Sequence, residues 1–366
     1  MTDVPAKSLA SRASRRSILK GLGAAAIGIS LSGKKYSAAW AAEEPKLNFY
    51  NWDTYIGETT LADFQKASGI DVNMSLFATN DELFAKLRAG NPGFDVIVPG
   101  SEFVERMIQA NLLEPLDHAK IPNIKNVAPE FINDAPYDPG RKFSMPYTWL
   151  VIGIGYRKSK VKEVPDSWKY LFDSDEYKGR IAVMSDASEL FRNAFKYLGQ
   201  SINSTSPELI KQVEAMLIKQ KPNIKSFHED NGQDLLASGE VDVVMEYNGD
   251  IAQVMAEDDD LDFVVPKEGA MKQSDTLAIP KGAPHPENAL KFINFILDAK
   301  VGAEISETIK YPSPNAAAVA LMPDSYKDNK VIFPPADVMA KCEYPRYLGP
   351  EVTRLLDEAM TRLRAA

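Results

Sequence analysis

The sequence predicts an α/β protein with two lobes and a cleft between them. The chain has 366 residues, more than one typical domain, and its 45% hydrophobic and 25% charged residues are usual for a soluble globular protein. Strand-like and helix-like segments alternate along it, which is the pattern of largely parallel sheets. Since no separate linker divides an early set of segments from a later one, we expect lobes joined by extended crossings, near 151–156 and 268–276, that can hinge.

The first lobe is predicted to consist of strand–helix units. Strand-like segments at 47–52, 70–78 and 95–100 alternate with helical patterns at 60–69, 80–90 and 101–111. Asn80 and Gly90 mark the expected start and end of the second of these helices. We assign residues 42–152 to the first part of lobe 1.

A second α/β set begins beyond the apolar segment at 146–159. Its segments lie at 180–186, 189–199, 206–220, 224–228, 232–240, 241–249 and 262–269. An apolar segment at 274–280 then leads to one long helical pattern at 286–309. We assign 153–272 to lobe 2, and 273–366 to the second part of lobe 1 and the C-terminal helices.

The first 41 residues are predicted to be an export signal. Two arginines in SRRSILK (14–20) precede a weakly apolar stretch too short to span a bilayer, and small residues surround a plausible cleavage point after Ala41. This segment resembles a twin-arginine signal, with Ile18 where phenylalanine is commoner. A Sec signal with two arginines and an uncleaved anchor are the alternatives. No cysteine follows the apolar stretch, so we expect a soluble periplasmic product rather than a lipoprotein.

The charge of the chain limits the classes of ligand it is expected to bind, and its cysteine count excludes an internal disulfide. Removing residues 1–41 leaves 35 basic against 50 acidic side chains, a formal charge of −15. Such a surface argues against binding to nucleic acid or anionic membranes and modestly favours cationic ligands. The single cysteine, Cys342, cannot form an internal disulfide.

The sequence contains no pattern typical of catalysis or metal binding. None of the three histidines, His118, His228 and His285, has the spacing of metal ligands, and no nucleophile elbow, P-loop, zinc-protease or paired-cysteine motif is present. We expect neither a metal nor a cofactor. Paired carboxylates are frequent in an acidic chain, so a hydrolase that uses two of them is left open.

Aromatic and acidic side chains instead follow the predicted strands. Ligands of open α/β sheets bind outside the carboxyl ends of strands, and Trp52 and Tyr55 follow the first strand where the backbone should turn toward solvent. These aromatics either staple the loop to the core or contact a ligand. Aromatic faces suit methylene groups and cations, and carboxylates bind ammonium groups, so the pattern favours an alkylammonium ligand.

With these residues the chain resembles the periplasmic spermidine/putrescine-binding proteins of ABC importers. The segments FYNWDTYI, DVIVPGSEFVERM, SMPYTWLVIGIGYR, MSDASELFRNAFKYLG, GEVDVVMEYNG, DTLAIP and ETIKYPSPN follow the family's order and spacing over nearly the whole mature chain. The resemblance implies a two-lobed, type II periplasmic-binding-protein fold that closes on its ligand in a hinged inter-lobe cleft. It also implies delivery to an inner-membrane ABC permease, without catalysis, by a protein expected to be a monomer.

The resemblance also implies a set of ligand-binding residues. Trp52, Tyr55 and Tyr311 match cage aromatics, Asp275 matches a central carboxylate, and Tyr247 stands where a tryptophan is usual. The complete predicted site consists of Trp52, Tyr55, Glu102, Asp186, Glu189, Tyr247, Asp250, Asp275 and Tyr311. Helix capping is an alternative explanation for Asp186 and Glu189, and core packing is one for Tyr247.

Departures from the family leave the ligand open within its class. Gln273 replaces an aromatic, Glu102 stands where an aromatic or a small hydroxyl is usual, and Gly100 replaces a serine. We predict a binding protein for putrescine or spermidine. A zwitterionic amino compound is the alternative that Gln273 favours, although no arginine stands at the matched positions to hold a carboxylate.

Overall fold

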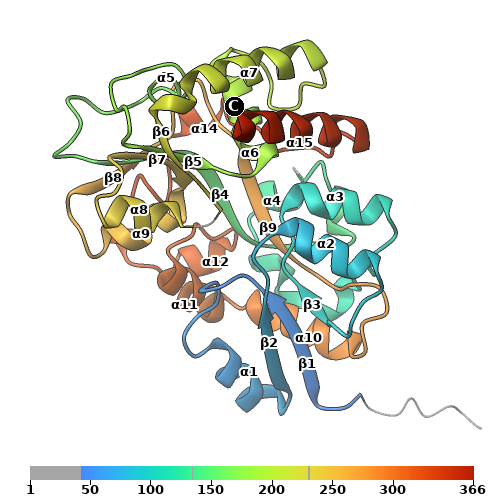
Figure 1. Ribbon diagram of the computed structural model, residues 1–366. Coiled ribbons are helices and arrows are strands. Elements are labelled where there is room, and N and C mark those ends of the chain that lie inside the picture. The colour runs from blue at the N-terminus through green and yellow to red at the C-terminus, as the bar shows by residue number, and fades with distance from the viewer. Residues whose placement is uncertain (1–42, 134, 230) are drawn as a thin grey trace, which may run out of the picture. The chain divides into compact units, whose positions relative to one another are not determined.

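The computed structural model describes residues 43–133, 135–229 and 231–366. The predicted export signal, 1–41, lies outside these residues. The described chain is mixed α/β, and its nine strands form one sheet in the order β2-β1-β3-β9-β4-β7-β5-β6, with β8 paired to β4 (Figure 1). The predicted α/β class is therefore confirmed.

Strands and helices alternate through most of the described chain. The strands are β1 (Lys46–Asn51), β2 (Asp71–Leu76), β3 (Val96–Ile97), β4 (Ser144–Arg157), β5 (Ile181–Met184), β6 (Ile224–His228), β7 (Val243–Tyr247), β8 (Leu261–Val264) and β9 (Lys272–Ala278). The helices before β5 are α1 (Thr60–Ser68), α2 (Asn80–Arg88), α3 (Ser101–Gln109), α4 (Pro129–Asn133) and α5 (Lys169–Phe172). Those after it are α6 (Ala187–Tyr197), α7 (Pro207–Gln220), α8 (Gly232–Ala237), α9 (Asn248–Met255), α10 (Pro286–Ile296), α11 (Ala299–Ile309), α12 (Ala316–Val319), α13 (Asp324–Lys327), α14 (Ala336–Met339) and α15 (Pro350–Ala365).

Strand direction is only partly as expected. β1 pairs in parallel with β2 and β3, and β5 pairs in parallel with β6 and β7. The middle strands β4 and β9 are antiparallel to each other and to their other neighbours. A largely parallel sheet is thus wrong for the centre, because a chain that crosses from one strand–helix set to the other and returns must run in both directions there.

The long strand β4 belongs to both halves of the sheet. Its residues Ser144–Val151 pair with β9, and Ile152–Tyr156 pair with β7. Figure 1 shows β4 and β9 running between the group of elements around β1 and the group around β5. β4 contains the predicted crossing at 151–156, and β9 contains the second half of the one at 268–276. Residues beside these two strands therefore lie between the two groups.

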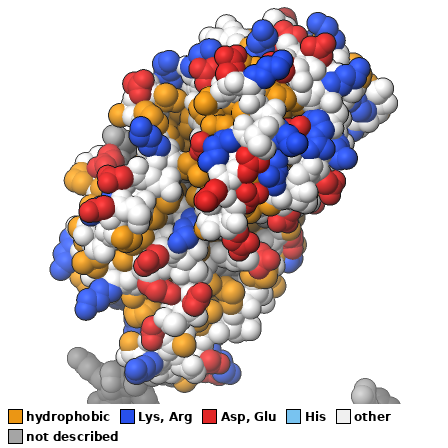
Figure 2. All heavy atoms as spheres, turned by 90° about the vertical axis from the view of Figure 1, so that its left-hand side faces the viewer, with side chains coloured by type: hydrophobic (Ala, Val, Ile, Leu, Met, Phe, Trp, Pro, Cys, Tyr) orange, Lys and Arg blue, Asp and Glu red, His pale blue; other side chains and the backbone are white. Residues whose placement is uncertain are grey.

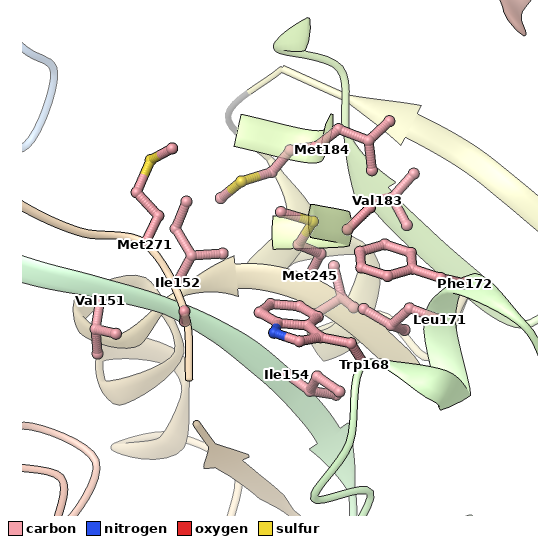
Figure 3. Close-up of a cluster of buried hydrophobic side chains, with 14 of the residues drawn as sticks. Val151, Ile152, Ile154, Trp168, Leu171, Phe172, Val183, Met184, Met245 and Met271 are labelled. Atoms are coloured by element: carbon pink, nitrogen blue, oxygen red, sulfur yellow. The ribbon is translucent and has the colours of Figure 1, made fainter. Parts of the chain in front are cut away.

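The largest apolar core surrounds the second half of β4. Trp168 is fully buried there, stacks on Phe172 with ring centroids 5.4 Å apart, and donates its indole N–H to the Gly269 carbonyl at 2.8 Å (Figure 3). The apolar face of α15, with Leu356 and Met360, belongs to the same core. The C-terminal helix therefore packs with α6 and α7, and its N-terminal half faces the cleft.

Two further cores lie around β1. One includes Phe49 on β1 and Phe292 on α10, whose rings meet edge to face at 5.0 Å, and the other lies beneath α2 and α3. Edge-to-face contact between buried rings stabilises by about 0.5–1.5 kcal/mol beyond the burial of their area. Helices α2 and α3, which present their first turns to the cleft, are thereby anchored on the β1 side.

The predicted single helix at 286–309 is wrong. The structure has two helices, α10 and α11, separated at Leu297 and Asp298. The Asp298 side chain accepts a hydrogen bond from the Lys300 backbone N–H at 2.9 Å and so caps α11. Because an N-cap residue has an extended backbone, an aspartate in this position starts a new helix rather than continuing the old one.

In the described part of the chain, no helix combines the length and the apolar character that crossing a bilayer requires.

Candidate functional site

All nine residues predicted for the site line a single cavity of about 500 Å³. Its walls come from the loops after β1 and β3 on one side and from α6, α9 and α15 on the other. A second hollow, of about 790 Å³, lies between α3 and α15 and contains none of the nine. The fold therefore brings together predicted residues that lie up to 259 positions apart in the chain, from Trp52 to Tyr311.

The loop after β1 holds its two aromatics firmly. Trp52 donates its indole N–H to the Val98 carbonyl at 2.9 Å, and its ring packs on Phe77 at 4.3 Å. Between the aromatics, Thr54 has a φ of 48°, a left-handed conformation that is uncommon for a β-branched residue. This turn directs Tyr55 back toward the sheet. The aromatics are thus both packed as staples and exposed to the cavity, and the two explanations do not exclude each other.

Tyr55 is joined to the central carboxylate. Its hydroxyl donates to Asp275 Oδ2 at 2.8 Å and lies 2.5 Å from Thr148 Oγ1. Since the single hydroxyl hydrogen of Tyr55 goes to Asp275, Thr148 donates to the Tyr55 oxygen. Burial raises the pKa of Tyr55 well above its usual value, and the Asp275 charge adds to this. Tyr55 therefore stays a donor at neutral pH and fixes the position of a carboxylate that is 7% exposed.

A second tyrosine–aspartate pair lies beside the first. Tyr311 donates to Asp250 Oδ1 at 2.7 Å, and its ring meets that of Tyr55 edge to face at 5.0 Å. Burial is the main cause that raises the pKa of Tyr311 well above its usual value, and the charge of Asp250 raises this pKa further. A Cβ at Gly249 would lie 2.3 Å from the Tyr311 ring, so only glycine lets this ring approach α9.

Two residues that are expected from the sequence to depart from the resembled family, Tyr247 and Gln273, surround Glu189. Tyr247 donates its hydroxyl to Glu189 Oε1 at 2.5 Å, and Gln273 donates its amide to the same oxygen at 3.0 Å. A carboxylate that accepts two hydrogen bonds on one oxygen is held in a single orientation. Tyr247 and Gln273 thus position an acid of the opposite wall. Gly100 leaves room nearby, because a Cβ there would lie 3.2 Å from both Asn80 and Gln273.

Asp186 is a helix cap as well as a cavity residue. It is the N-cap of α6, and its Oδ1 accepts from the Glu189 N–H at 2.9 Å. The capping explanation is therefore correct for Asp186. Desolvation raises the pKa of Asp186, and the bond from Glu189 N–H opposes the increase. A nearby cation would favour its charged form.

Glu102 lines the cavity but is already paired. Its Oε1 accepts from Arg192 Nη2 at 3.0 Å, and its Oε2 accepts from Ser188 at 3.4 Å. Burial raises the pKa of the Glu102 carboxyl, and the guanidinium of Arg192 opposes this. Glu102, where the resemblance implies an aromatic or a small hydroxyl, thus forms an ion pair.

Acidic side chains dominate the cavity. Among the described residues that line it, ten are Asp or Glu, two are Arg and none is Lys. One of the arginines, Arg106, is itself bound to Asp81 at 2.9 Å. On the face drawn in Figure 2, by contrast, basic and acidic side chains are interspersed. Carboxylates concentrated in a cleft with low-dielectric walls attract and hold cations.

Sequence reasoning missed several cavity residues. The most important is Arg192, which lines the cavity and is 2% exposed. No arginine stands at the sequence positions matched to the family's binding residues. One signal was available: Arg192 lies three residues after Glu189, on the same helix face, within an otherwise apolar pattern. Tyr347 and Asp357, next to α3, gave no signal, because only the packing of α15 brings them to the cavity.

The described residues include no group of three or more His, Cys, Asp or Glu side chains that could hold a metal ion.

Comparison with known proteins places this site in a family. Residues 59–334 match the bacterial extracellular solute-binding proteins. The chain is 35% identical over 343 residues to the putrescine-binding periplasmic protein PotF of Escherichia coli, covering 89% of this chain and 93% of the relative. It is also 35% identical over 331 residues to the spermidine/putrescine-binding periplasmic protein of Salmonella typhimurium, covering 90% and 94%.

A solved structure gives the same result for the fold. The spermidine/putrescine ABC transporter substrate-binding protein PotD of Streptococcus pneumoniae superposes with a TM-score of 0.78 at 31% identity, covering 87% of this chain and 98% of that one. The predicted two-lobed periplasmic-binding-protein fold is confirmed. With its fold, the match over 59–334 and relatives at 35% identity, the chain belongs to the bacterial extracellular solute-binding proteins, in the group of the polyamine-binding proteins of ABC importers.

Proposed function

We propose that this protein captures a polyamine, putrescine or spermidine, in the periplasm and delivers it to an ABC permease of the inner membrane. The observation that carries the proposal is the cavity itself, whose described lining has ten carboxylates against two guanidiniums, together with Trp52, Tyr55, Tyr247 and Tyr311. Methylene chains pack on aromatic faces, and ammonium groups need carboxylates when they leave water. No covalent chemistry is required.

The two walls of the cavity offer separate places for two ammonium groups. Asp275 and Asp250, each fixed by a tyrosine, would hold one end of the ligand. Glu189, fixed by Tyr247 and Gln273, would hold the other together with Asp186. Trp52, Tyr55 and Tyr311 would cover the chain between them, and Glu102 would contribute through its pair with Arg192.

Binding would be coupled to closure of the lobes. We propose that lobe 1 comprises 42–152 with a second part that begins at 273, and that lobe 2 comprises 153–272. The C-terminal segment 343–366, which ends in α15, packs with lobe 2, because Glu343 accepts from Lys196 on α6 and the apolar face of α15 belongs to the largest core. β4 and β9, which pair across both, would act as the hinge. The protein would act as a monomer.

A ligand screen by thermal unfolding tests the proposal. Putrescine and spermidine at one hundred times their dissociation constants should each stabilise the protein by about 2.7 kcal/mol. Trp52 fluorescence should change in the same titrations, since only two other tryptophans, Trp149 and Trp168, follow residue 41. Binding of neither polyamine, with the protein shown to be folded, would refute the proposed function.

A zwitterionic amino compound is a second candidate, and Arg192 favours it. Arg192 lines the cavity, and its Nε and Nη1 have no hydrogen-bond partner among the described residues. Guanidinium groups bind carboxylates with two hydrogen bonds, so a linear amino acid could place its carboxylate there and its ammonium at Asp275. Including 4-aminobutanoate and 5-aminopentanoate in the screen separates the candidates, because the polyamine proposal expects both to bind far more weakly than putrescine.

We also propose that residues 1–41 are a twin-arginine signal that is cleaved after export. The support is the pair Arg15 and Arg16 before a weakly apolar stretch. Replacing both by lysine should leave the precursor in the cytoplasm, as measured by fractionation and immunoblotting. An unchanged amount of mature protein in the periplasm would show that the pair is not needed and that export follows the Sec route.

A further inference from the structure

Helix α3 presents two glutamates to two arginines on the opposite side of the cleft. Glu102 and Glu105 are one turn apart, and α3 is anchored on the β1 side through Val104 and Met107. Glu102 pairs with Arg192 at 3.0 Å, on a helix whose apolar residues belong to the core around β5. Glu105 pairs with Arg346 through two hydrogen bonds of 2.7 and 3.0 Å.

The segment that carries Arg346 is hydrogen-bonded to the same side as Arg192, although the ring of Tyr344 also packs beside Tyr137 on the β1 side. The Arg346 backbone N–H donates to Asn203, and Glu343 accepts from Lys196 on α6 at 2.8 Å. Arg192 Nη2 also donates to the Arg346 carbonyl at 3.2 Å, so the two ion pairs are connected. The Tyr347 backbone N–H adds a further bond to Glu105 Oε2 at 3.0 Å. All of these bonds to Glu102 and Glu105 must break if the lobes separate.

We propose that Glu102 and Glu105, with Arg192 and Arg346, form an inter-lobe latch that sets the balance between open and closed forms and thereby the affinity for the ligand. Glu105 does not line the ligand cavity, so its effect on binding would be that of a positioning residue. For a ligand that binds the closed form, the apparent affinity falls in proportion to the fraction of protein that is closed. The latch therefore tunes affinity without contacting the ligand.

The two pairs should contribute unequally. Arg192 is 2% exposed, and removing the charge of Glu102 leaves this guanidinium buried without its partner in the closed form. The Arg346 and Glu105 side chains are 43% and 14% exposed, so their pair is partly screened by water. In the open form all four groups are free to be hydrated, which is why the cost falls on closure.

The chain offers a matched control. Arg362 on α15 binds Glu214 on α7 through two hydrogen bonds of 2.6 and 2.8 Å, and these side chains are 50% and 13% exposed. This pair has the same chemistry, geometry and exposure as Arg346 with Glu105. The main difference is its place, because α7 and α15 pack on the same core and do not separate when the cleft opens. In addition, Arg362 lies 3.9 Å from Glu358, and Glu105 accepts the bond from the Tyr347 backbone N–H.

The test compares Glu105→Gln with Glu214→Gln by calorimetry with putrescine and spermidine. Glu105→Gln should weaken binding by about three- to tenfold, in the range of partly exposed to buried charge pairs. Glu214→Gln should leave affinity unchanged while reducing thermal stability at least as much. Glu102→Gln should weaken binding more than Glu105→Gln. Unchanged affinity of Glu105→Gln, or equal weakening by Glu214→Gln, would overturn the latch.

A double-mutant cycle with Arg346→Gln separates the contribution of the ion pair from the contributions of its two side chains. The double variant Glu105→Gln/Arg346→Gln should bind about as well as the worse single variant, and full additivity would contradict a pairwise latch.

The ligand measurements rest on the proposed function, and small-angle scattering does not. Without ligand, Glu102→Gln/Glu105→Gln should have a larger radius of gyration than the unsubstituted protein, and Glu214→Gln should not. Identical values for all three would refute the latch even if polyamine binding were established. A larger radius only in the α3 variant would support the latch even if no polyamine bound.

Discussion

Asp275→Asn should weaken polyamine binding by about 2–5 kcal/mol, or roughly thirtyfold to several thousandfold. Asp275 is 7% exposed, lies on the central strand β9, and is fixed by the Tyr55 hydroxyl at 2.8 Å. Asparagine keeps the shape and still accepts the bond from Tyr55, but it removes the charge that an ammonium group requires on leaving water. Calorimetry with putrescine and spermidine on both proteins measures the difference.

The substituted protein should be no less stable than the original when no ligand is present, because a charge in a strongly acidic cavity is removed. Asp71→Asn, at the exposed start of β2, is a control that changes net charge equally outside the cavity. If Asp275→Asn binds with unchanged affinity, Asp275 only orders strand β9 around it, and Asp250, Glu189 and Asp186 must recognise the charge.

Stability should fall by up to about 3 kcal/mol as pH decreases from 6.5 to 4, because of one buried histidine. His228 is 3% exposed at the end of β6, and its Nε2 lies 3.0 Å from the Met245 carbonyl. Burial lowers its pKa from 6.5 to about 4. Between these values the unfolded chain binds a proton that the folded protein excludes, so acid favours unfolding. Above pH 6.5 the histidine is neutral in both states and the dependence ends.

Urea unfolding at pH 4, 5, 6 and 7 measures this dependence. His228→Gln should be less dependent on pH across the window than the unsubstituted protein. Among the described residues, the acidic side chain that faces the imidazole is Glu246, whose Oε2 lies 3.7 Å from Nδ1. Glu246→Gln retains His228 and should retain its pH dependence. A slope that survives in His228→Gln and disappears in Glu246→Gln would assign the effect to the glutamate.

The sequence identified residues that line the cavity where a side chain's position follows from the end of a strand or the first turn of a helix. Tyr247 at the end of β7 and Glu189 in the first turn of α6 are of this kind, because strand ends and helix starts meet at the edge of a sheet. Asp275 lies instead in the middle of β9. Arg192 was missed because its partner, Glu102, comes from a helix 90 residues away across the cleft. A charge that is buried by a distant partner looks, in sequence, like any arginine on a helix surface.

By itself, the sequence determined the α/β class, the two-lobed fold and the residue types that gather at the strand ends, since these depend on local periodicity, turn residues and short-range order. Only the tertiary structure decided which carboxylates remain directed at the cavity and which are paired. Tyr247 and Gln273 converge on one oxygen of Glu189, while Glu102 is neutralised by Arg192. The physical reason is that desolvation and Coulomb interactions depend on distances between elements remote in the chain, and no local pattern encodes those distances.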